Sequence, residues 1–274
     1  MTKTTKKRII GIDVARALAV IGMIIVNFKV VFGETGDHWI KPFANFFSGK
    51  AAATFVVLAG VGLALMTNSA VKNQDAEKLR KGRIGILKRA LFLFVIGLSY
   101  AAIWPADILH FYGIYMLLTL FFINRSSRQI LLGTGALVLL FPLLYLFFDY
   151  EQGWIFELWH YTDFWTLEGF FRNLFFNGFH PVIPWAAFML FGLWYGRQNL
   201  YDATFLRKSL IISTLVFLGI QALSITISPP VPGGAFGEGD FLSLLCSTDP
   251  MPPLPLYMLN GMSIAIAVIS ACIL

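Results

Sequence analysis

Eight apolar runs recur along the chain, and most of them are long enough to cross a lipid bilayer as a helix. They cover residues 9–32, 49–68, 89–104, 111–123, 130–148, 182–197, 209–228 and 255–274, of which the third and fourth are short. Only 13% of the residues are charged, against about 25% in a typical soluble domain. The sequence therefore predicts an all-α, polytopic integral membrane helix bundle with about eight transmembrane helices.

The distribution of Lys and Arg predicts the orientation of the bundle. If the N-terminus is cytoplasmic, 17 of the 21 basic residues fall on the inner side, and only Lys29, Lys41, Lys50 and Arg172 fall outside. This bias is typical of cytoplasmic loops. The net charge of +6 is then a topological signal, and nucleic acid is excluded as a partner. The apolar stretch after the basic tail MTKTTKKR is too long for a signal-peptide core, which predicts an uncleaved first helix.

The polar residues concentrate on the opposite, outer side. All four histidines and 11 of the 15 acidic residues fall there, and the exceptions are Asp13, Asp75, Glu77 and Asp202. The outer loop at residues 149–181 is rich in Trp and Phe, which is typical of a segment lying in the membrane interface. The outer face is therefore the predicted working face.

The last run ends at Leu274 without a polar tail, so we expect the chain to continue beyond that residue. No internal repeat is visible that would indicate the pseudosymmetry of a transporter. Residues 1–274 are predicted to form a single membrane-embedded domain, truncated at its C-terminal end.

The first run carries polar groups near both of its ends. Asp13 and Arg16 lie three residues apart and share a helix face. They either form an ion pair, with Arg16 reaching toward lipid phosphates, or Arg16 binds an anionic cytoplasmic ligand. Asn27 either hydrogen-bonds a neighbouring helix or donates to a developing oxyanion. His38, preceded by Asp37, is either a solvated loop residue or a general base for a hydroxyl or an amine.

Two further polar clusters fall on the outer side. Asp107, His110 and Tyr112 lie at the break between the third and fourth runs, and His180 and Trp185 lie at the start of the sixth. Either each cluster is a solvated loop, or the clusters converge on a site that binds a substrate.

The stretch from Ser48 to Met66, which covers most of the second run, is rich in Gly and Ala. Small residues let helices pack closely in a membrane. The alternative is a helix kept slim to leave room for a bound cofactor. Lys50, at its outer end, either snorkels to the interface or binds an anion.

Several familiar active-site signatures are missing from the sequence. No glycine-rich phosphate loop follows a strand, and no set of His, Cys and Asp has metal-binding spacing. No Gly-x-Ser-x-Gly nucleophile elbow is present. Cys246 and Cys272 are far apart in different settings. We therefore expect no metal site and no disulfide.

Four motifs, in order, resemble those of a known group of membrane proteins. GIDVARALAVIGMIIVNF resembles the first-helix signature of the YeiB-like bacterial family and the first helix of heparan-alpha-glucosaminide N-acetyltransferase. SGKAAATFVVLAGVGLALM, ADILHFYGIYMLL and NGFHPVIPWAAFMLFGLWYGR are similar to later motifs of the same group, and DPMPPLPLY is a fainter echo. The four matches span most of residues 8–197.

The resemblance implies a bacterial inner-membrane acyltransferase that takes an acyl group from acetyl-CoA or another acyl-CoA in the cytoplasm. It implies an acceptor, a glycan or small molecule with an amine or hydroxyl, on the other side. The catalytic His of the family lies eleven residues after the Asn that closes the first helix, and His38 and Asn27 share that spacing. The chain departs from the pattern at Lys50, where Arg is usual, and at Ala17, where Gly is found.

The leading hypothesis is acyl transfer across the lipid bilayer, with a homodimer left open. His38 and Asn27 are the expected catalytic pair, and Arg16 with Asp13 is expected to bind the acyl-CoA. The residues expected to bind the acceptor are Asp107, His110, Tyr112, His180, Trp185 and Lys50. The alternatives are a transporter or channel for an organic anion or a lipid-linked precursor, and a membrane scaffold without catalysis.

Overall fold

The computed structural model describes residues 8–32, 40–104, 106–227 and 241–274. Within these ranges the chain is almost entirely helical, which confirms the all-α prediction. Each of the eight predicted apolar runs overlaps one long helix. These helices are α1 (Ile10–Phe32), α3 (Lys50–Lys72), α4 (Ala76–Tyr100), α5 (Leu109–Phe122), α6 (Ser127–Phe147), α8 (Val182–Tyr195), α9 (Ala203–Ile227) and α11 (Pro255–Ile273).

Among the described residues, five helices are long and apolar enough to cross a membrane. They are α1, α3 together with the preceding short helix α2 (Ile40–Phe47), α6, α9 and α11. A bent pair, residues 167–177 followed by α8 at an angle of 47°, makes a possible sixth span. The structure therefore has the character of a multi-pass membrane protein, with a count below the eight spans that the sequence predicts.

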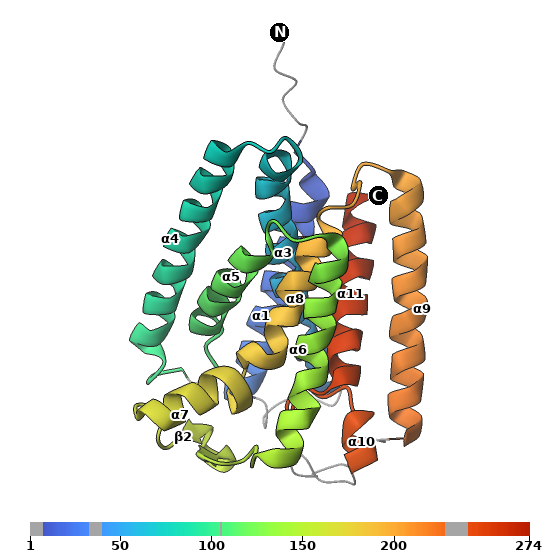
Figure 1. Ribbon diagram of the computed structural model, residues 1–274. Helices are drawn as coiled ribbons and strands as arrows, with labels where there is room; N and C mark the ends of the chain where they lie inside the picture. The colour runs from blue at the N-terminus through green and yellow to red at the C-terminus, as the bar shows by residue number, and fades with distance from the viewer. Residues whose placement is uncertain (1–7, 33–39, 105, 228–240) are drawn as a thin grey trace.

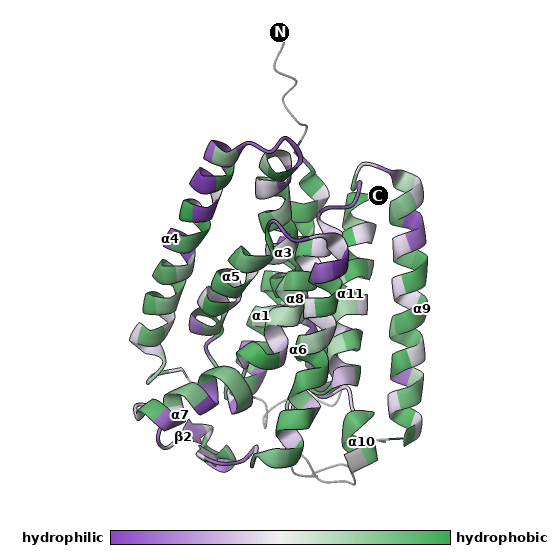
Figure 2. Cartoon of the chain, in the orientation of Figure 1, coloured by the Kyte–Doolittle hydropathy of each residue, from purple (hydrophilic) through white to green (hydrophobic). Residues whose placement is uncertain are grey.

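The long helices run alternately up and down the bundle (Figure 1). The start of α1 and the end of α11 lie at the same end, which we call the N-terminal end. Hydrophilic residues concentrate at the ends of the helices, and their flanks are apolar (Figure 2). Exposed Ile, Leu, Val and Phe side chains are common on α1, α4, α6 and α9, as expected for surfaces that face lipid.

The helix boundaries follow from local capping. The third predicted run begins at residue 89, but α4 begins at Ala76, because the Asp75 carboxylate accepts a hydrogen bond from the Lys78 backbone N–H at 2.9 Å. The helix thus continues through a charged segment that hydropathy alone would leave as a loop. Ser126 and Gln129 form a capping box at the start of α6.

The core is the close packing of α3 against α8. A Cβ added at Gly60 or at Gly192 would clash with the backbone of the other helix, and one at Gly196 would lie 2.8 Å from the Val61 Cα. Glycine at these positions lets the two backbones approach, as is common between membrane helices. Close packing is therefore one role of the small residues in α3.

Short elements close the end of the bundle opposite the N-terminus. They are β1 (Trp154–Ile155), the 3-10 helix η1 (Phe156–Leu158), β2 (His160–Tyr161), α7 (Leu167–Arg172), the π-helical turn η2 (Asn173–Asn177) and α10 (Phe241–Leu245). The two strands pair antiparallel, with Trp154 opposite Tyr161. The helix α7 lies across the end of the bundle (Figure 1).

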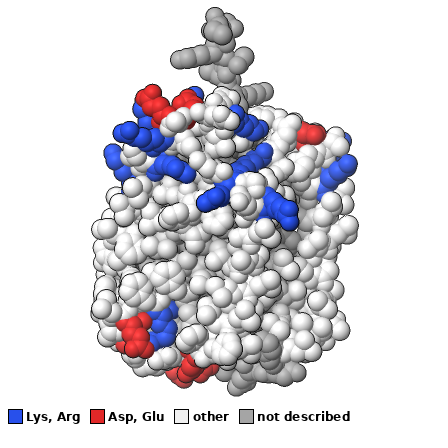
Figure 3. Space-filling view, in the orientation of Figure 1, with Lys and Arg blue, Asp and Glu red and all other residues white. Residues whose placement is uncertain are grey.

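Basic side chains are concentrated at one end of the bundle. On the face shown in Figure 3, Lys and Arg gather toward the N-terminal end, where α4, α6 and α9 begin. Acidic side chains are seen at both ends of this face. The basic residues in these first turns and the preceding loops include Lys78, Arg80, Lys81, Arg125, Arg128, Arg207 and Lys208.

Candidate functional site

A cavity of about 920 Å³ opens at the end of the bundle opposite the N-terminus. Its walls include six aromatic side chains, and we call it the aromatic cavity; they are Phe32, Phe47, Trp159, Phe179, His180 and Trp185. Segments far apart in the sequence meet there. The polar residues that line it are Asn27, Lys29, Asn45, Ser48, Glu157 and Asp249.

His180 and Trp185 form the inner wall of the aromatic cavity. Their rings pack edge to face, with centroids 4.5 Å apart. Tyr115, on α5, donates its hydroxyl to the carbonyl oxygen of His180 and so fixes the start of α8. His180 Nδ1 and Trp185 Nε1 are buried and have no hydrogen-bond partner among the described residues. The hydrogen-bonding capacity of both nitrogens is therefore unsatisfied by the described residues.

Asp107 and His110 lie directly behind this wall, and each is only 2% exposed. Asp107 Oδ2 is 2.6 Å from His110 Nδ1 and accepts the His110 backbone N–H at 3.1 Å. Its Oδ1 accepts the Leu109 backbone N–H at 2.8 Å and the Tyr100 hydroxyl. The carboxylate therefore caps the first turn of α5 and has two hydrogen bonds on each oxygen, which leaves it no free lone pair.

The same hydrogen bonds keep Asp107 ionised. Burial alone raises the pKa of this carboxyl, but hydrogen bonds from His110, Tyr100 and the backbone N–H of Leu109 lower it to about 2. An ionised carboxylate only accepts hydrogen bonds, so the Nδ1 atom of His110 carries a proton. The Nε2 atom of His110 is buried and has no hydrogen-bond partner among the described residues.

The two outer clusters converge, as one of the sequence hypotheses requires. The Phe111 ring lies beside His110, at 3.9 Å between centroids, and 6.2 Å from the His180 ring on its other side. His180 also interacts electrostatically with Asp107 and His110. Asp107 and His110 stand behind the cavity wall, whereas His180 and Trp185 line it.

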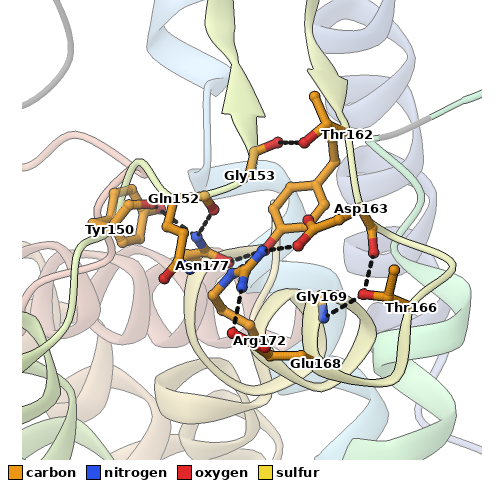
Figure 4. A network of polar contacts seen from close by, with 11 residues as sticks. Tyr150, Gln152, Gly153, Thr162, Asp163, Thr166, Glu168, Gly169, Arg172 and Asn177 are labelled. Carbon is orange, nitrogen blue, oxygen red and sulfur yellow. Dashed lines mark hydrogen bonds and ion pairs between the residues drawn. The ribbon is translucent and has the colours of Figure 1, made fainter.

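A polar network holds the aromatic loop in place (Figure 4). Asn177 donates to the carbonyl oxygens of Tyr150 and Gln152 at 2.9 and 2.8 Å. Arg172 forms an ion pair with Asp163 at 2.5 Å. Trp154 donates its indole N–H to the Asn177 carbonyl at 2.6 Å. These bonds fix the segment that carries Trp159, Phe179 and His180 into the aromatic cavity.

The first helix contributes Asn27 to the aromatic cavity, where its side chain is exposed. His38 lies outside the described residues. Phe32, the last residue of α1, also lines the cavity. Lys50 lies at the start of α3 with its Nζ 5.9 Å from the centre of the Phe46 ring.

A second cavity, of about 400 Å³, lies among α1, α3, α4 and α5. Arg16 and Arg89 bring two guanidinium groups to it, and we call it the basic cavity. Its remaining lining is apolar or aromatic. These residues are Phe55, Ala59, Gly62, Leu63, Met66, Phe92, Leu93, Tyr112 and Met116.

Asp13 lies on the same helix as Arg16 and pairs with it at 3.1 Å and with Arg8 at 2.7 Å. The pairs are partly exposed, so they contribute little to stability. Arg16 takes part in the ion pair and also lines the basic cavity, while its binding of an anionic ligand stays a prediction. The sequence groups Tyr112 with Asp107 and His110. In the structure Tyr112 lies about one turn into α5 and lines the basic cavity, not the aromatic cavity.

Sequence reasoning did not single out Tyr100, Tyr115 or Asn177, which hold the aromatic side together. A signal existed for Tyr115, because a hydroxyl inside an apolar helix needs an internal partner. In the part of the chain that the structure describes, no three His, Cys, Asp or Glu side chains cluster as metal ligands would. Cys246 and Cys272 are both free thiols.

A comparison with known families gives one match. The sequence model of the catalytic domain of heparan-alpha-glucosaminide N-acetyltransferase matches residues 8–228. That range extends from α1 to α9, so it includes every residue that lines the basic cavity. Searches of the curated proteins and of the solved structures found no match. Because the match covers most of the chain, the protein belongs to the family of the heparan-alpha-glucosaminide N-acetyltransferase catalytic domain.

Proposed function

We propose that this protein transfers an acetyl or other acyl group from cytoplasmic acyl-CoA to a hydroxyl or amine on the opposite side of the membrane. Family membership indicates a transmembrane acetyltransferase. The observation that carries the finer proposal is the pair of cavities, one basic and one aromatic, that share walls from α1, α3 and the start of α5. Their unlike chemistry suits an anionic donor on one side and a neutral acceptor on the other.

The orientation of the proposal follows the charge. Cytoplasmic loops carry an excess of Lys and Arg, so the N-terminal end is cytoplasmic. In this arrangement α4, α5 and α8 also cross, which gives eight crossings in a bacterial inner membrane. The charged first half of α4 then lies at the cytoplasmic surface, and residues 1–274 act as one acyltransferase-like domain.

The basic cavity is the proposed donor site. CoA carries phosphates, and Arg16 and Arg89 attract them electrostatically. The apolar wall, which includes Phe55 and Met66, suits the less polar pantetheine arm. Tyr112 lies between the arginines and the deeper part of the bundle, where the thioester would be found.

The aromatic cavity is the proposed acceptor site. Flat rings such as Trp185 and Trp159 pack against the apolar faces of a sugar and leave its hydroxyls free to hydrogen-bond. The unpartnered nitrogens of His180 and Trp185 supply such bonds. Lys50 adds a cation near the rim that suits an acidic substituent. His110 supports this wall from behind, since Asp107 fixes its ring.

The chemistry is a direct transfer. His38 removes the proton from the acceptor hydroxyl or amine, and the oxygen or nitrogen attacks the thioester carbonyl carbon. Asn27 donates a hydrogen bond to the oxyanion of the tetrahedral intermediate. The C–S bond then breaks, and the CoA thiolate leaves and takes up a proton. His38 comes to this role from the sequence resemblance, and Asn27 also from its place in the cavity.

The test is release of CoA thiol by the purified protein, supplied with acetyl-CoA and a panel of amino sugars and sugar alcohols. His38→Ala is expected to lose at least about a hundredfold in rate, the usual worth of a general base. Asn27→Ala is expected to lose a similar factor. His160→Ala removes an exposed histidine of β2 on the same side and should match the wild type.

Equal activity in His38→Ala and in the wild type would remove His38 from the mechanism. A transporter is the competing function, because two cavities along one path also suit passage of a solute. Uptake of an organic anion by protein-containing vesicles without any acyl donor would support the transporter instead.

A further inference from the structure

The helix α3 is buried on every side but one. Between Ala51 and Ala64 ten positions are buried, and only Ala52, Phe55, Ala59 and Gly62 are partly exposed. These four positions are three, four and three residues apart, so they form a single helical face.

Both cavities open on this face of α3. Ala52 lines the aromatic cavity, while Phe55, Ala59 and Gly62 line the basic cavity. Only one helical turn separates Ala52 from Phe55. The two cavities therefore follow one another along the same wall.

The helix α1 shows the same arrangement. Arg16 lines the basic cavity, and Met23 and Asn27, seven and eleven residues later, line the aromatic cavity. These spacings keep all three on one face of the helix.

The helix α5 gives a third wall. Ile108, just before its first residue, lines the aromatic cavity, and Tyr112 and Met116 line the basic cavity at steps of four. Three helices thus border both spaces. The boundary between the cavities falls at one level, between Ala52 and Phe55 on α3 and between Ile108 and Tyr112 on α5.

Two rings occupy that level. The Phe55 and Tyr112 rings face each other with centroids 5.8 Å apart and planes tilted by 41°. The other exposed positions of the α3 face are small, and a Cβ added at Gly62 would meet nothing within 4 Å. Side-chain bulk on this wall is therefore concentrated at Phe55 and its partner.

We propose that Phe55 and Tyr112 form the aperture between the two cavities and select acyl groups by cross-section. This inference rests on the proposed acyl transfer, because the thioester must pass the two rings to reach Asn27. A linear acyl chain is no wider than the pantetheine arm that follows it, so it passes. A branched or aromatic acyl group is wider and is held back by the rings.

The first experiment tests the aperture without catalysis. In a Cys246→Ser, Cys272→Ser background, Ala52→Cys or Ala59→Cys is introduced, and a small membrane-impermeant methanethiosulfonate is added on the aromatic side of sealed vesicles. Ala52→Cys is expected to react and Ala59→Cys to be protected. Adding Phe55→Ala is expected to expose Ala59→Cys to the reagent. Phe92→Ala, a ring of the basic cavity away from the boundary, should leave it protected.

Each outcome of the labelling experiment either supports or overturns the aperture. Reaction of Ala59→Cys with Phe55 intact, or its protection in Phe55→Ala, would overturn the aperture. A midpoint of thermal unfolding close to that of the wild type shows that each variant is folded, and reaction of Ala52→Cys shows that the reagent reaches the aromatic cavity. A protein that shows the expected labelling but transfers no acyl group retains the aperture and refutes the proposed function.

The second experiment tests selection with isomeric donors. Butyryl-CoA and isobutyryl-CoA have the same number of carbons and differ in cross-section. The wild type is expected to favour the linear donor in kcat/KM, and Phe55→Ala to reduce that preference by about tenfold or more, a factor typical of one misplaced methyl group. Phe121→Ala, which removes an exposed ring of α5 that lines neither cavity, should keep the wild-type ratio. An unchanged ratio in Phe55→Ala would overturn selection by the rings.

Discussion

The aromatic cavity and the basic cavity differ in how their polar groups are held. Behind the aromatic cavity, Asp107 and His110 are buried and joined by hydrogen bonds that use every lone pair of the carboxylate. In the basic cavity, the Arg16 side chain is 43% exposed, and Arg89 is exposed as well. Fixed groups suit a site that must hold reacting atoms in place, whereas mobile cations suit capture of a soluble anion.

The largest effect is expected from disturbing the buried cluster of Asp107 and His110 behind the aromatic cavity. Gly97 of α4 packs against the cluster, and a Cβ there would lie 2.6 Å from Asp107 Oδ2 and clash with the His110 backbone nitrogen. Gly97→Leu is expected to destabilise the protein by about 3 kcal/mol or more, because backbone atoms cannot move aside. The measurement is the midpoint of thermal unfolding in detergent.

Gly85→Leu is the matched control, since it lies on the same helix and a Cβ there would meet nothing within 4 Å. It is expected to unfold at the wild-type temperature. If Gly97→Leu does so too, α4 does not hold the cluster, and the aromatic side is no more rigid than the basic side.

The next effect concerns the charge on Asp107. Its folded pKa of about 2 lies below its ordinary value of 3.8, so ionisation of this group stabilises the fold above pH 4. That stability, about 2 kcal/mol by the usual conversion, is lost as the pH falls through the folded pKa. Asp107→Asn is expected to be less stable than the wild type at pH 6, with the difference shrinking between pH 4 and pH 2.

Unfolding midpoints across this pH range give the result. Glu77→Gln removes an exposed carboxylate of α4 and should follow the wild type throughout. A constant difference between Asp107→Asn and the wild type from pH 6 to pH 2 would show that the carboxylate is not ionised in the fold.

Much of the architecture could be predicted, because membrane helices are recognised in a sequence by their length and apolar composition. All eight runs became helices. What failed was local: α4 starts at Ala76 because Asp75 caps a charged turn, which hydropathy does not register. Among the described residues, helix length and composition support five crossings, or six with the bent pair, because α5 has only 14 residues and the first half of α4 is charged; the count of eight stays a prediction.

The site was partly predictable. Residue type singled out His180, Trp185 and Arg16, since polar groups in apolar runs are costly. Their grouping was not predictable, because neighbours in sequence separate in space. Tyr112 follows His110 by two residues, yet it faces the basic cavity, since two helical residues point about 200° apart. The sequence marks Asp107 as a residue expected to bind the acceptor. In the structure its carboxylate caps α5 and hydrogen-bonds His110, so its hydrogen-bonding capacity is fully used.

The smallest effect is expected from removing the charge of Arg16 or Arg89 in the basic cavity. Arg16→Gln or Arg89→Gln should each weaken CoA binding by about three- to tenfold, because exposed charges lose much of their attraction to water and salt. The loss should be larger at low ionic strength, where screening is weaker. Thermal stabilisation by added CoA measures this without any need for turnover.

Arg128→Gln, at the same end but outside the cavity, should leave CoA binding near the wild-type value. Because the Arg16 and Arg89 side chains are exposed, neither substitution should lower the unfolding temperature of the free protein, whereas Gly97→Leu and Asp107→Asn, behind the aromatic cavity, should. A drop in stability of the free protein on removing Arg16 would mean that its pair with Asp13 is structural, and the difference between the two cavities would narrow to one of charge alone.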